Sequence, residues 1–540
     1  MKLNKFNYLD NPYKSQRMTV LGKNGMVATS QPLAAQAGLS VLRRGGNAVD
    51  AAVATAAALT VLEPTSNGIG SDAFAIVWVD GKLHGLNSSG QAPAGISREK
   101  VRELGHDEMP KYGLTPVTVP GAPAAWAALN YRFGKLPLIE VLSEAIRYAE
   151  NGFPVSPVTA AAWQRAAEVY KKNLDGEEFA GWFKTFTDKN QNAPKAGEIW
   201  RSYDHAATLK SIAHTGAESF YNGEIAEKIG EFSEKHDGFI RGRDLASFKP
   251  EWVEPLSVNY RGYDIWELPP NGQGIIALIA LNILKEFKLE GLSQVEKYHK
   301  SIEALKLAFA DGQKYITDPE KMALKPEELL SQAYAEKRSK LIGEQALTPE
   351  PGQPPKGGTV YLAAADRDGQ MVSFIQSNYM GFGSGIVVPG TGIALQNRGH
   401  TFSLDPEHEN SLEPGKRTYH TIIPGFMTKD DQPVGPFGVM GGFMQPQGHL
   451  QVIMNTIDRG FNPQAALDAP RWQWTEDKKI KVESSFPTRE GKLLAERGHE
   501  IQVSLSSGSF GRGQIIWKDE NTGVLAGATE PRTDGTVAAF

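Results

Sequence analysis

The sequence predicts a mixed α and β fold, and three features support that prediction. Two apolar runs, Thr359–Asp366 and Met371–Ser377, flank Asp368-Gly369, a dipeptide typical of hairpin turns, so we expect two paired strands. Ala48–Leu62 is alanine-rich and apolar throughout, but it is too short to cross a bilayer and is typical of a buried helix. Helical patterns dominate the first part of the chain, whereas strand patterns dominate the second.

Helix caps, glycines and a turn dipeptide predict the N-terminal elements. Pro32–Arg44 has helical apolar spacing and should end at Gly45, because glycine can terminate a helix in left-handed geometry. Asn47 is a suitable cap for the alanine-rich helix that follows it. Ala73–Val79 has the pattern of a strand, and the turn dipeptide Asp80-Gly81 predicts a second strand through Leu86.

The later elements are mostly helices, followed by one clear boundary. We expect helices at Pro137–Asn151, Ala160–Lys171, Ile225–Glu234, Ile275–Phe287, Tyr298–Tyr315 and Leu450–Ile457. From Leu347 to Lys356 the chain is rich in proline and glycine, which makes this segment the best internal boundary. It lies directly before Gly358-Thr359.

Composition excludes several functional classes. The 540 residues carry a formal charge of −5 without a basic block, so nucleic acid is not an expected partner. The absence of cysteine excludes disulfides and thiol catalysis, and the 11 histidines are scattered, so we expect neither a metal site nor another cofactor. Met1–Val20 lacks the apolar stretch of a signal peptide, so we expect a cytoplasmic protein without a membrane partner.

The junction Gly358-Thr359 has two interpretations. A threonine that opens a buried strand after two glycines can simply be a strand entry after a flexible loop. It can also be an N-terminal nucleophile: if the chain breaks before Thr359, its hydroxyl can attack a carbonyl. The new α-amino group, with a pKa of about 7.7, can take the proton. The residues of the junction alone do not decide between the two.

Three other motifs have weaker support. The loop Gly68–Ser71 resembles a phosphate cradle, but no Gly-Lys-Ser/Thr follows it and a strand comes next. Ser97 and Lys100 have the spacing of penicillin-recognising enzymes, and Ser257-Val258-Asn259 superficially fits their second motif. No Lys-Thr-Gly follows, so Ser97 is better explained as a helix cap.

Long blocks in a fixed order give the chain a resemblance to the γ-glutamyltranspeptidase family. These blocks are Pro32–Gly38, Gly45–Ala54, Glu63–Gly70, Val119–Gly121 and Tyr131–Pro137. The resemblance implies an α/β fold, the four-layer αββα sandwich of N-terminal nucleophile hydrolases, with the whole chain in one structural domain. It also implies a precursor that cuts itself between Gly358 and Thr359 into a large fragment, 1–358, and a small fragment, 359–540.

The same resemblance assigns catalytic roles to four residues. Thr359 matches the nucleophile, and Ser377 falls where the family has a threonine whose hydroxyl orients that nucleophile. Gly441 and Gly442 match the pair whose backbone N–H groups stabilise the oxyanion, although paired glycines can also form an ordinary tight turn.

The expected substrate pocket departs from the family pattern. Ser89 stands where the family has an arginine for the substrate α-carboxylate, and Thr401 stands where it has an aspartate for the α-amino group. Arg398 adds a cation three residues before Thr401. The pocket therefore loses contacts for a zwitterionic head and gains one for an anion.

Three further pocket positions combine matches and changes. Tyr379 replaces a common asparagine, His420 replaces the first of two serines that hold the substrate carboxylate, and Thr421 matches the second. The resemblance thus implies an amidohydrolase that acts on γ-glutamyl or glutaryl-like amides of small molecules or peptides, with weak transpeptidation. An ordinary γ-glutamyltranspeptidase acting on glutathione and a non-catalytic binding protein on the same fold are the alternatives.

Overall fold

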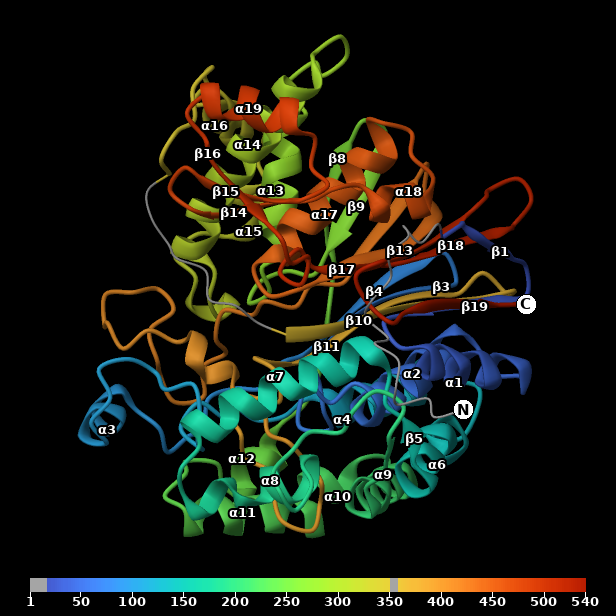
Figure 1. The fold of residues 1–540 in the computed structure, drawn as a ribbon, viewed down its shortest axis with the longest axis vertical. Helices are drawn as coiled ribbons and strands as arrows, with labels where there is room; N and C mark the ends of the chain where they lie inside the picture. Colours follow the sequence, from blue (N-terminus) through green and yellow to red (C-terminus); the bar gives the residue numbers. More distant parts are fainter. Residues whose placement is uncertain (1–16, 350–357) are drawn as a thin grey trace.

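The computed structural model describes residues 17–349 and 358–540 and contains two large sheets packed face to face (Figure 1). Within each of the two seven-stranded sheets, all neighbouring strands pair antiparallel. Both sheets combine strands from before and after residue 358. The expectation about Met1–Val20 and the boundary at Leu347–Lys356 fall largely outside the described residues.

The strand order explains why the two halves of the sequence cannot be separated in space. The first sheet runs β1 (Val20–Gly22), β18 (Leu525–Thr529), β17 (Arg512–Lys518), β13 (Gln432–Met440), β12 (Gly425–Lys429), β9 (Tyr263–Glu267) and β8 (Leu256–Tyr260). The second runs β19 (Thr536–Ala539), β2 (Gly25–Thr29), β10 (Gly358–Asp366), β11 (Met371–Tyr379), β3 (Asp72–Val79), β4 (Lys82–Ser88) and β7 (Glu251–Val253). Smaller sheets are formed by β14 (Trp472–Glu476), β15 (Lys479–Glu483) and β16 (Glu500–Ser504), and by β5 (Phe153–Pro154) and β6 (Ile199–Trp200).

Strand β10 is an interior strand of the second sheet, between β2 and β11. Its side chains alternate between two cores, as strand geometry requires. Val360 and Leu362 pack toward helices, whereas Tyr361 and Ala363 pack toward the opposite sheet. Because both faces are covered, the strand that begins at Gly358-Thr359 is apolar throughout, which explains the continuous apolar run in the sequence.

Three hydrophobic clusters define the layers of a four-layer αββα sandwich, which confirms the predicted fold class. One cluster joins the second sheet to its outer helices, and a second joins the first sheet to helices on the opposite side. The third lies between the sheets, where Phe74 and Ile375 from one sheet meet Phe426 and Ile516 from the other. The core therefore continues through all four layers.

The helices fall into two outer layers (Figure 1). Against the second sheet, or beside its helices, lie α1 (Pro32–Arg43), α2 (Ala48–Leu62), α3 (Arg98–Glu103), α4 (Ala122–Phe133), α5 (Leu138–Val141), α6 (Ser143–Asn151), α7 (Pro157–Asn173), α8 (Ala180–Phe186), α9 (Tyr203–Thr215), α10 (Glu218–Tyr221), α11 (Glu224–Lys235) and α12 (Gly242–Ser247). On the other side lie α13 (Gly274–Leu284), α14 (Gln294–Tyr315), α15 (Pro326–Leu329), α16 (Gln332–Ser339), α17 (Met444–Ile457), α18 (Pro463–Asp468) and α19 (Thr488–Glu496).

Most expected elements are confirmed, including both hairpins and the caps at Asn47 and Ser97. Four helix predictions were wrong in extent. Helix α13 ends at Leu284 rather than Phe287, and α14 begins at Gln294 rather than Tyr298. The single helix Pro137–Asn151 is interrupted at Leu142, whose ψ of −3° departs from the helical value near −42°. Helix α17 starts at Met444 rather than Leu450. Pro446 lies in its first turn, where backbone N–H groups have no partner within the helix, so proline is tolerated there.

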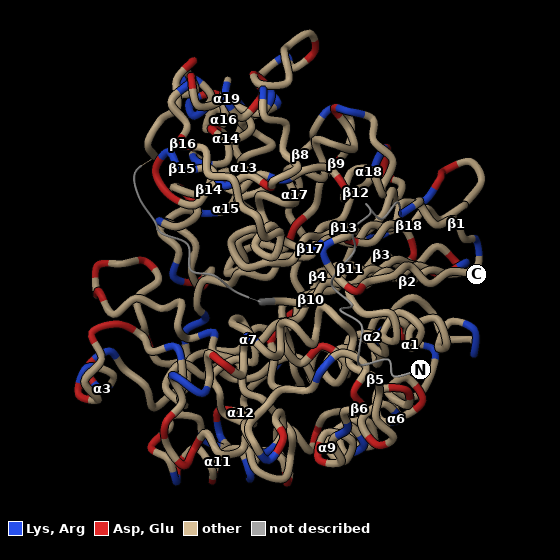
Figure 2. The backbone as a smooth tube through the Cα atoms, in the orientation of Figure 1, with Lys and Arg blue, Asp and Glu red and all other residues tan. Residues whose placement is uncertain are grey.

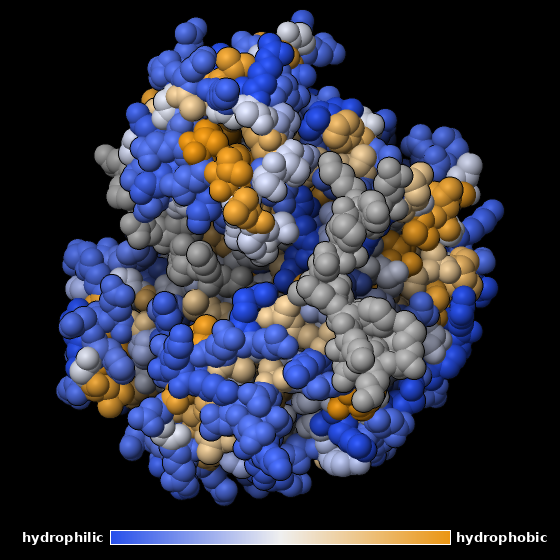
Figure 3. Space-filling model, in the orientation of Figure 1, coloured by the Kyte–Doolittle hydropathy of each residue, from blue (hydrophilic) through white to orange (hydrophobic). Residues whose placement is uncertain are grey.

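Charges of both signs are interspersed over both helical layers, without a large block of one sign (Figure 2). The face shown in Figure 3 is mostly hydrophilic, with an apolar patch over β15 and β16. Among the described residues, no helix has the length and apolarity needed to cross a membrane.

Candidate active site

Thr359 is fully buried at the start of β10, and two side chains contact its hydroxyl. Its Oγ1 donates to Ser377 Oγ at 3.1 Å and accepts a long hydrogen bond from Gln445 Nε2 at 3.5 Å. The register between β10 and β11 shifts between Gly358 and Val360, so Thr359 occupies an irregular position at the strand entrance. The structure thus presents a buried hydroxyl, held by polar side chains, next to the expected cleavage position.

Ser377 reaches Thr359 because β11 runs antiparallel to β10. It continues the alternate row of Met371, Ser373 and Ile375, of which Met371 and Ile375 face the opposite sheet. Its Oγ also accepts from the backbone N–H of Tyr379 at 2.8 Å. This second bond fixes the serine hydroxyl, so that it can orient the hydroxyl of Thr359.

The glycine pair forms the turn between β13 and α17. Gly441 has a φ of 135° and Gly442 a φ of 60°, values that strongly favour glycine. Gln445, in the first turn of α17, carries the side chain that contacts Thr359. The Gly441-Gly442 turn is therefore close in sequence to a residue that touches the candidate nucleophile.

Arg398 is the central cation of the predicted pocket. Its side chain is buried, its Nη1 donates to Thr421 Oγ1 at 2.7 Å, and its guanidinium lies 4.5 Å from the centre of the Tyr379 ring. Its Nε forms an ion pair with Asp72 Oδ2 at 3.5 Å. Burial lowers the pKa of Arg398 to about 10, and Asp72 opposes that shift, so the group is charged at neutral pH.

Asp72 also binds His420. His420 Nε2 lies 2.9 Å from Asp72 Oδ2, and His420 Nδ1 accepts from the backbone N–H of Ile422. Burial and the neighbouring Arg398 charge lower the pKa of His420 to about 4, so the imidazole is neutral near pH 7 and its Nε2–H donates to the carboxylate. Arg398 and His420 thus converge on one buried carboxylate.

The hydroxyl groups of two predicted pocket residues form hydrogen bonds with other groups of the protein. Ser89 Oγ donates to Asn87 Oδ1 at 2.7 Å and lies close to the Asn271 side chain. Thr401 Oγ1 contacts the carbonyls of Arg398 and Tyr419 and the hydroxyl of Thr418. The Ser89 hydroxyl is therefore tied to Asn87 and Asn271, and Thr401 fixes the short helical turn that carries Arg398.

Sequence reasoning missed three residues of this site. Asp72, Gln273 and Gln445 are polar side chains that are fully buried. Asp72 offered the clearest signal, because a carboxylate that opens a buried strand needs a partner. The two glutamines gave none, since their partners lie far away in the sequence.

One cluster of potential metal ligands occurs among the described residues, formed by His299, Glu303 and His499. Its carboxylate already binds a cation, because the ammonium of Lys306 lies 2.7 Å from Glu303 Oε1. Glu303 Oε2 also accepts from the backbone N–H of Leu347, and Lys306 donates to the Leu347 carbonyl. These contacts explain the cluster as an anchor for the chain at Leu347.

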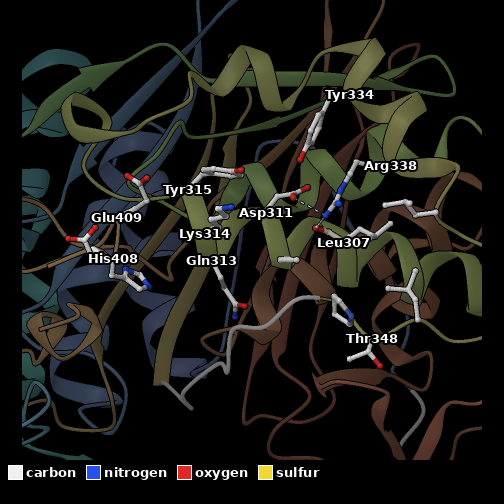
Figure 4. A pocket seen from close by; sticks show the side chains of 15 residues that line it. Leu307, Asp311, Gln313, Lys314, Tyr315, Tyr334, Arg338, Thr348, His408 and Glu409 are labelled. Atoms are coloured by element: carbon white, nitrogen blue, oxygen red, sulfur yellow. Dashed lines mark hydrogen bonds and ion pairs between the residues drawn. The ribbon is translucent and has the colours of Figure 1, made fainter. Parts of the chain in front are cut away.

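A cavity of about 800 Å³ opens between α14, α16 and the segments 347–349 and 407–409 (Figure 4). Its Asp311 and Arg338 side chains pair at 2.8 Å across two helices. The residues that line it include none of the predicted site residues. The cavity and the surroundings of Thr359 are therefore distinct features of the described structure.

Comparisons with known proteins show the family of this chain. A family model described as gamma-glutamyltranspeptidase matches residues 34–540. The glutathione hydrolase-like YwrD proenzyme of Bacillus subtilis is 36% identical over 97% of this chain and 99% of its own, and the oxamate amidohydrolase proenzyme of Klebsiella pneumoniae is 33% identical over 96% and 98%. The crystal structure of a cephalosporin acylase from Bacillus halodurans has a TM-score of 0.96 and 63% identity over 99% of both chains.

The sandwich of two sheets between helical layers matches known structures of N-terminal nucleophile hydrolases, and this chain is one of that class. The chain belongs to the γ-glutamyltranspeptidase family of such proenzymes. The family resemblance of the sequence is therefore confirmed.

Proposed function

We propose that this protein is a self-processing threonine amidohydrolase that cleaves acyl amides whose acyl group is anionic. The observation that carries the proposal is the buried Thr359 hydroxyl, held by Ser377 and Gln445 at the residue where the chain is expected to break. A non-catalytic binding protein would need none of these contacts. The names of the three relatives, a glutathione hydrolase-like protein, an oxamate amidohydrolase and a cephalosporin acylase, support the reaction class. Because these names refer to different substrates, the preferred acyl group is inferred from the residues around Arg398.

The reaction follows from the groups around Thr359. Hydrolysis of the bond between Gly358 and Thr359 frees an α-amino group with a pKa of about 7.7. This amine takes the proton of the hydroxyl as Oγ1 attacks the amide carbonyl, and it then gives the proton to the departing amine. Backbone N–H groups of the Gly441-Gly442 turn stabilise the oxyanion, and water finally hydrolyses the acyl ester.

Arg398 supports an anionic acyl group. Among the described residues, its Nη2 has no hydrogen-bond acceptor, although its Nη1 is held by Thr421. A carboxylate on the substrate can accept from Nη2, a charged hydrogen bond worth about 1.5–3 kcal/mol. A glutaryl group offers that carboxylate without the α-amino group, for which Thr401 provides no charge.

The test is a comparison of kcat/KM for glutaryl and γ-glutamyl p-nitroanilide, with and without glycylglycine. Loss of two charged contacts should weaken selection for a free γ-glutamyl head by about two to four orders of magnitude. We therefore expect glutaryl to be preferred and glycylglycine to have little effect. A strong preference for γ-glutamyl with marked acceleration by glycylglycine contradicts the proposal.

One observation favours a second candidate, a γ-glutamyltranspeptidase that acts on glutathione. Asp72 places a carboxylate beside Arg398, and opposite charges in one pocket suit a zwitterionic head. However, Asp72 is buried, and its oxygens contact His420 and the backbone N–H of Gly90 as well as Arg398. The acceptor assay separates the two candidates, because only the second predicts acceleration by glycylglycine.

A further inference from the structure

Gln273 connects the glycine turn to the Arg398 pocket. Its Nε2 donates to the carbonyls of Gly442 at 2.9 Å and Thr421 at 2.6 Å, and its Oε1 accepts from the hydroxyl of Tyr419 at 2.8 Å. The side chain is completely buried, directly before helix α13. All hydrogen-bonding positions of its amide nitrogen are used, along with one lone pair of its oxygen.

The orientation of this amide is fixed by its partners. Both carbonyls are acceptors only, so the NH₂ end must face them, and the Tyr419 hydroxyl must donate to the oxygen. A carboxylate of the same shape would place an oxygen against two carbonyl oxygens. Glutamine is therefore specified at this position by chemistry as well as by volume.

The hydrogen bond from Gln273 to the Gly442 carbonyl restricts the conformation of a turn in which glycine would otherwise be flexible. With a φ of 60°, Gly442 occupies one of several conformations that glycine adopts at little cost. The bond from Gln273, together with one from the backbone N–H of Gln445, holds the Gly442 carbonyl. Restricting this carbonyl restricts the peptide units on either side of it, which is the preorganisation that an oxyanion site needs.

The Thr421 contact extends the same constraint to the acyl pocket. The backbone of Thr421 is held by Gln273, while its hydroxyl accepts from Arg398 Nη1. Gln273 precedes the expected cleavage position, whereas both of its carbonyl partners follow it. In a processed protein, one side chain of the large fragment would thus hold two parts of the site in the small fragment.

We infer that Gln273 is a positioning residue, which orients the Gly441-Gly442 turn for the oxyanion and aligns it with the Arg398 pocket. The inference rests on the proposed amide hydrolysis, since the turn has a catalytic role only in that reaction. Gln273 acts through the backbone and takes no part in proton transfer. Its loss should therefore lower kcat more than it raises KM.

The experiment compares Gln273→Met, which keeps the length of the side chain, and Gln273→Glu, which keeps its shape. With the acyl p-nitroanilide that the wild type cleaves best, we expect kcat to fall by about 10- to 100-fold, with a smaller change in KM. Tyr419→Phe removes only the hydroxyl that holds the Gln273 oxygen, so it should fold normally and lower kcat less, in the same direction.

Gln451 provides a matched control. It is a buried glutamine whose Nε2 also donates to two backbone carbonyls, those of Gln447 at 3.0 Å and Trp472 at 2.9 Å. Gln451→Met should lower the melting temperature without changing kcat. If the Gln273, Gln451 and Tyr419 variants lost the same amount of melting temperature and all kept full kcat, the inference would be wrong. Gln273 would then have only a structural role. A wild type that cleaves no acyl amide would instead overturn the proposed function, and this inference with it.

Discussion

Arg398 and Asp72 form an ion pair at 3.5 Å in which both side chains are excluded from solvent. A buried pair of this kind is weak evidence for stability, because desolvation of the two charges offsets their attraction. Its position beside Thr421 and Tyr379 instead favours a role in substrate recognition. Asp72 arises from the second sheet, whereas Arg398 belongs to a short helical turn, Arg398–Thr401, so the pair also ties that turn to the sheet.

Replacement of Arg398 tests that role. Arg398→Met should lower kcat/KM for glutaryl p-nitroanilide by about 10- to 100-fold, since it removes one charged hydrogen bond to the substrate. Butyryl p-nitroanilide has a similar length without the carboxylate and serves as the internal control. Combining the change with Asp72→Asn avoids leaving an unpaired buried carboxylate. A loss of the same size for both substrates would show that Arg398 does not recognise the anion.

Ser377 should contribute to turnover rather than to binding. Ser377→Ala removes the oxygen that accepts from Thr359 Oγ1, so we expect kcat to fall by about 10- to 100-fold with little change in KM. Ser377→Thr keeps the hydroxyl and should retain most of the activity. Steady-state kinetics of both variants provide the measurement, and an alanine variant with normal kcat would remove Ser377 from the mechanism.

The glycine turn should not tolerate a side chain. Gly442→Val introduces a β-branched residue at a φ of 60° and should lower turnover by about 100-fold or more. Gly460→Val is the matched control, because Gly460 has a φ of 65° but lies in an exposed turn with open space around it. Equal kcat in the two folded variants would exclude the Gly441-Gly442 turn from catalysis.

The stability of the protein should depend on pH through buried histidines such as His205. Burial lowers the pKa of His205 to about 4, below the unfolded value near 6.5, so between these values the unfolded chain binds more protons. Stability is therefore full above pH 6.5 and falls toward pH 4, by up to about 1.4 kcal/mol per pH unit for this one group.

The measurement is urea unfolding of the wild type and His205→Gln at pH 4.5, 5.5 and 7.5. As the pH falls from 7.5 to 4.5, the free energy of unfolding should decrease less steeply in the variant than in the wild type. The difference in slope should correspond to about one bound proton. An identical slope in both proteins would mean that His205 does not remain neutral in the folded state.

The sequence was sufficient to predict the elements whose determinants are local. Asn47 caps its helix through a capping box with Asp50, and the Asp366–Gly369 turn closes the hairpin of β10 and β11. The hairpin placed Ser377 next to Thr359 without further information. One local signal was misleading. Because of Pro446, the start of α17 was predicted too late, so the contact between Gln445 and Thr359 was not expected.

The contacts within the pocket could not be predicted, because they join distant segments. Asp72 meets His420 across 348 positions, and Gln273 meets Gly442 across 169. Nothing in the sequence near Arg398 indicates that its charge faces a buried carboxylate, so the expectation of a purely cationic pocket was incomplete. Only the pairing of strands from both halves of the chain brings these groups together.

The central claim is that Thr359 becomes an N-terminal nucleophile, and intact-mass spectrometry of the purified protein tests it most directly. The account predicts two fragments, 1–358 and 359–540, that remain associated through their shared sheets, and a single uncut, inactive chain for Thr359→Ala. Fragments that still separate before residue 359 in that variant, or a wild type that stays whole and yet hydrolyses acyl amides, would contradict it.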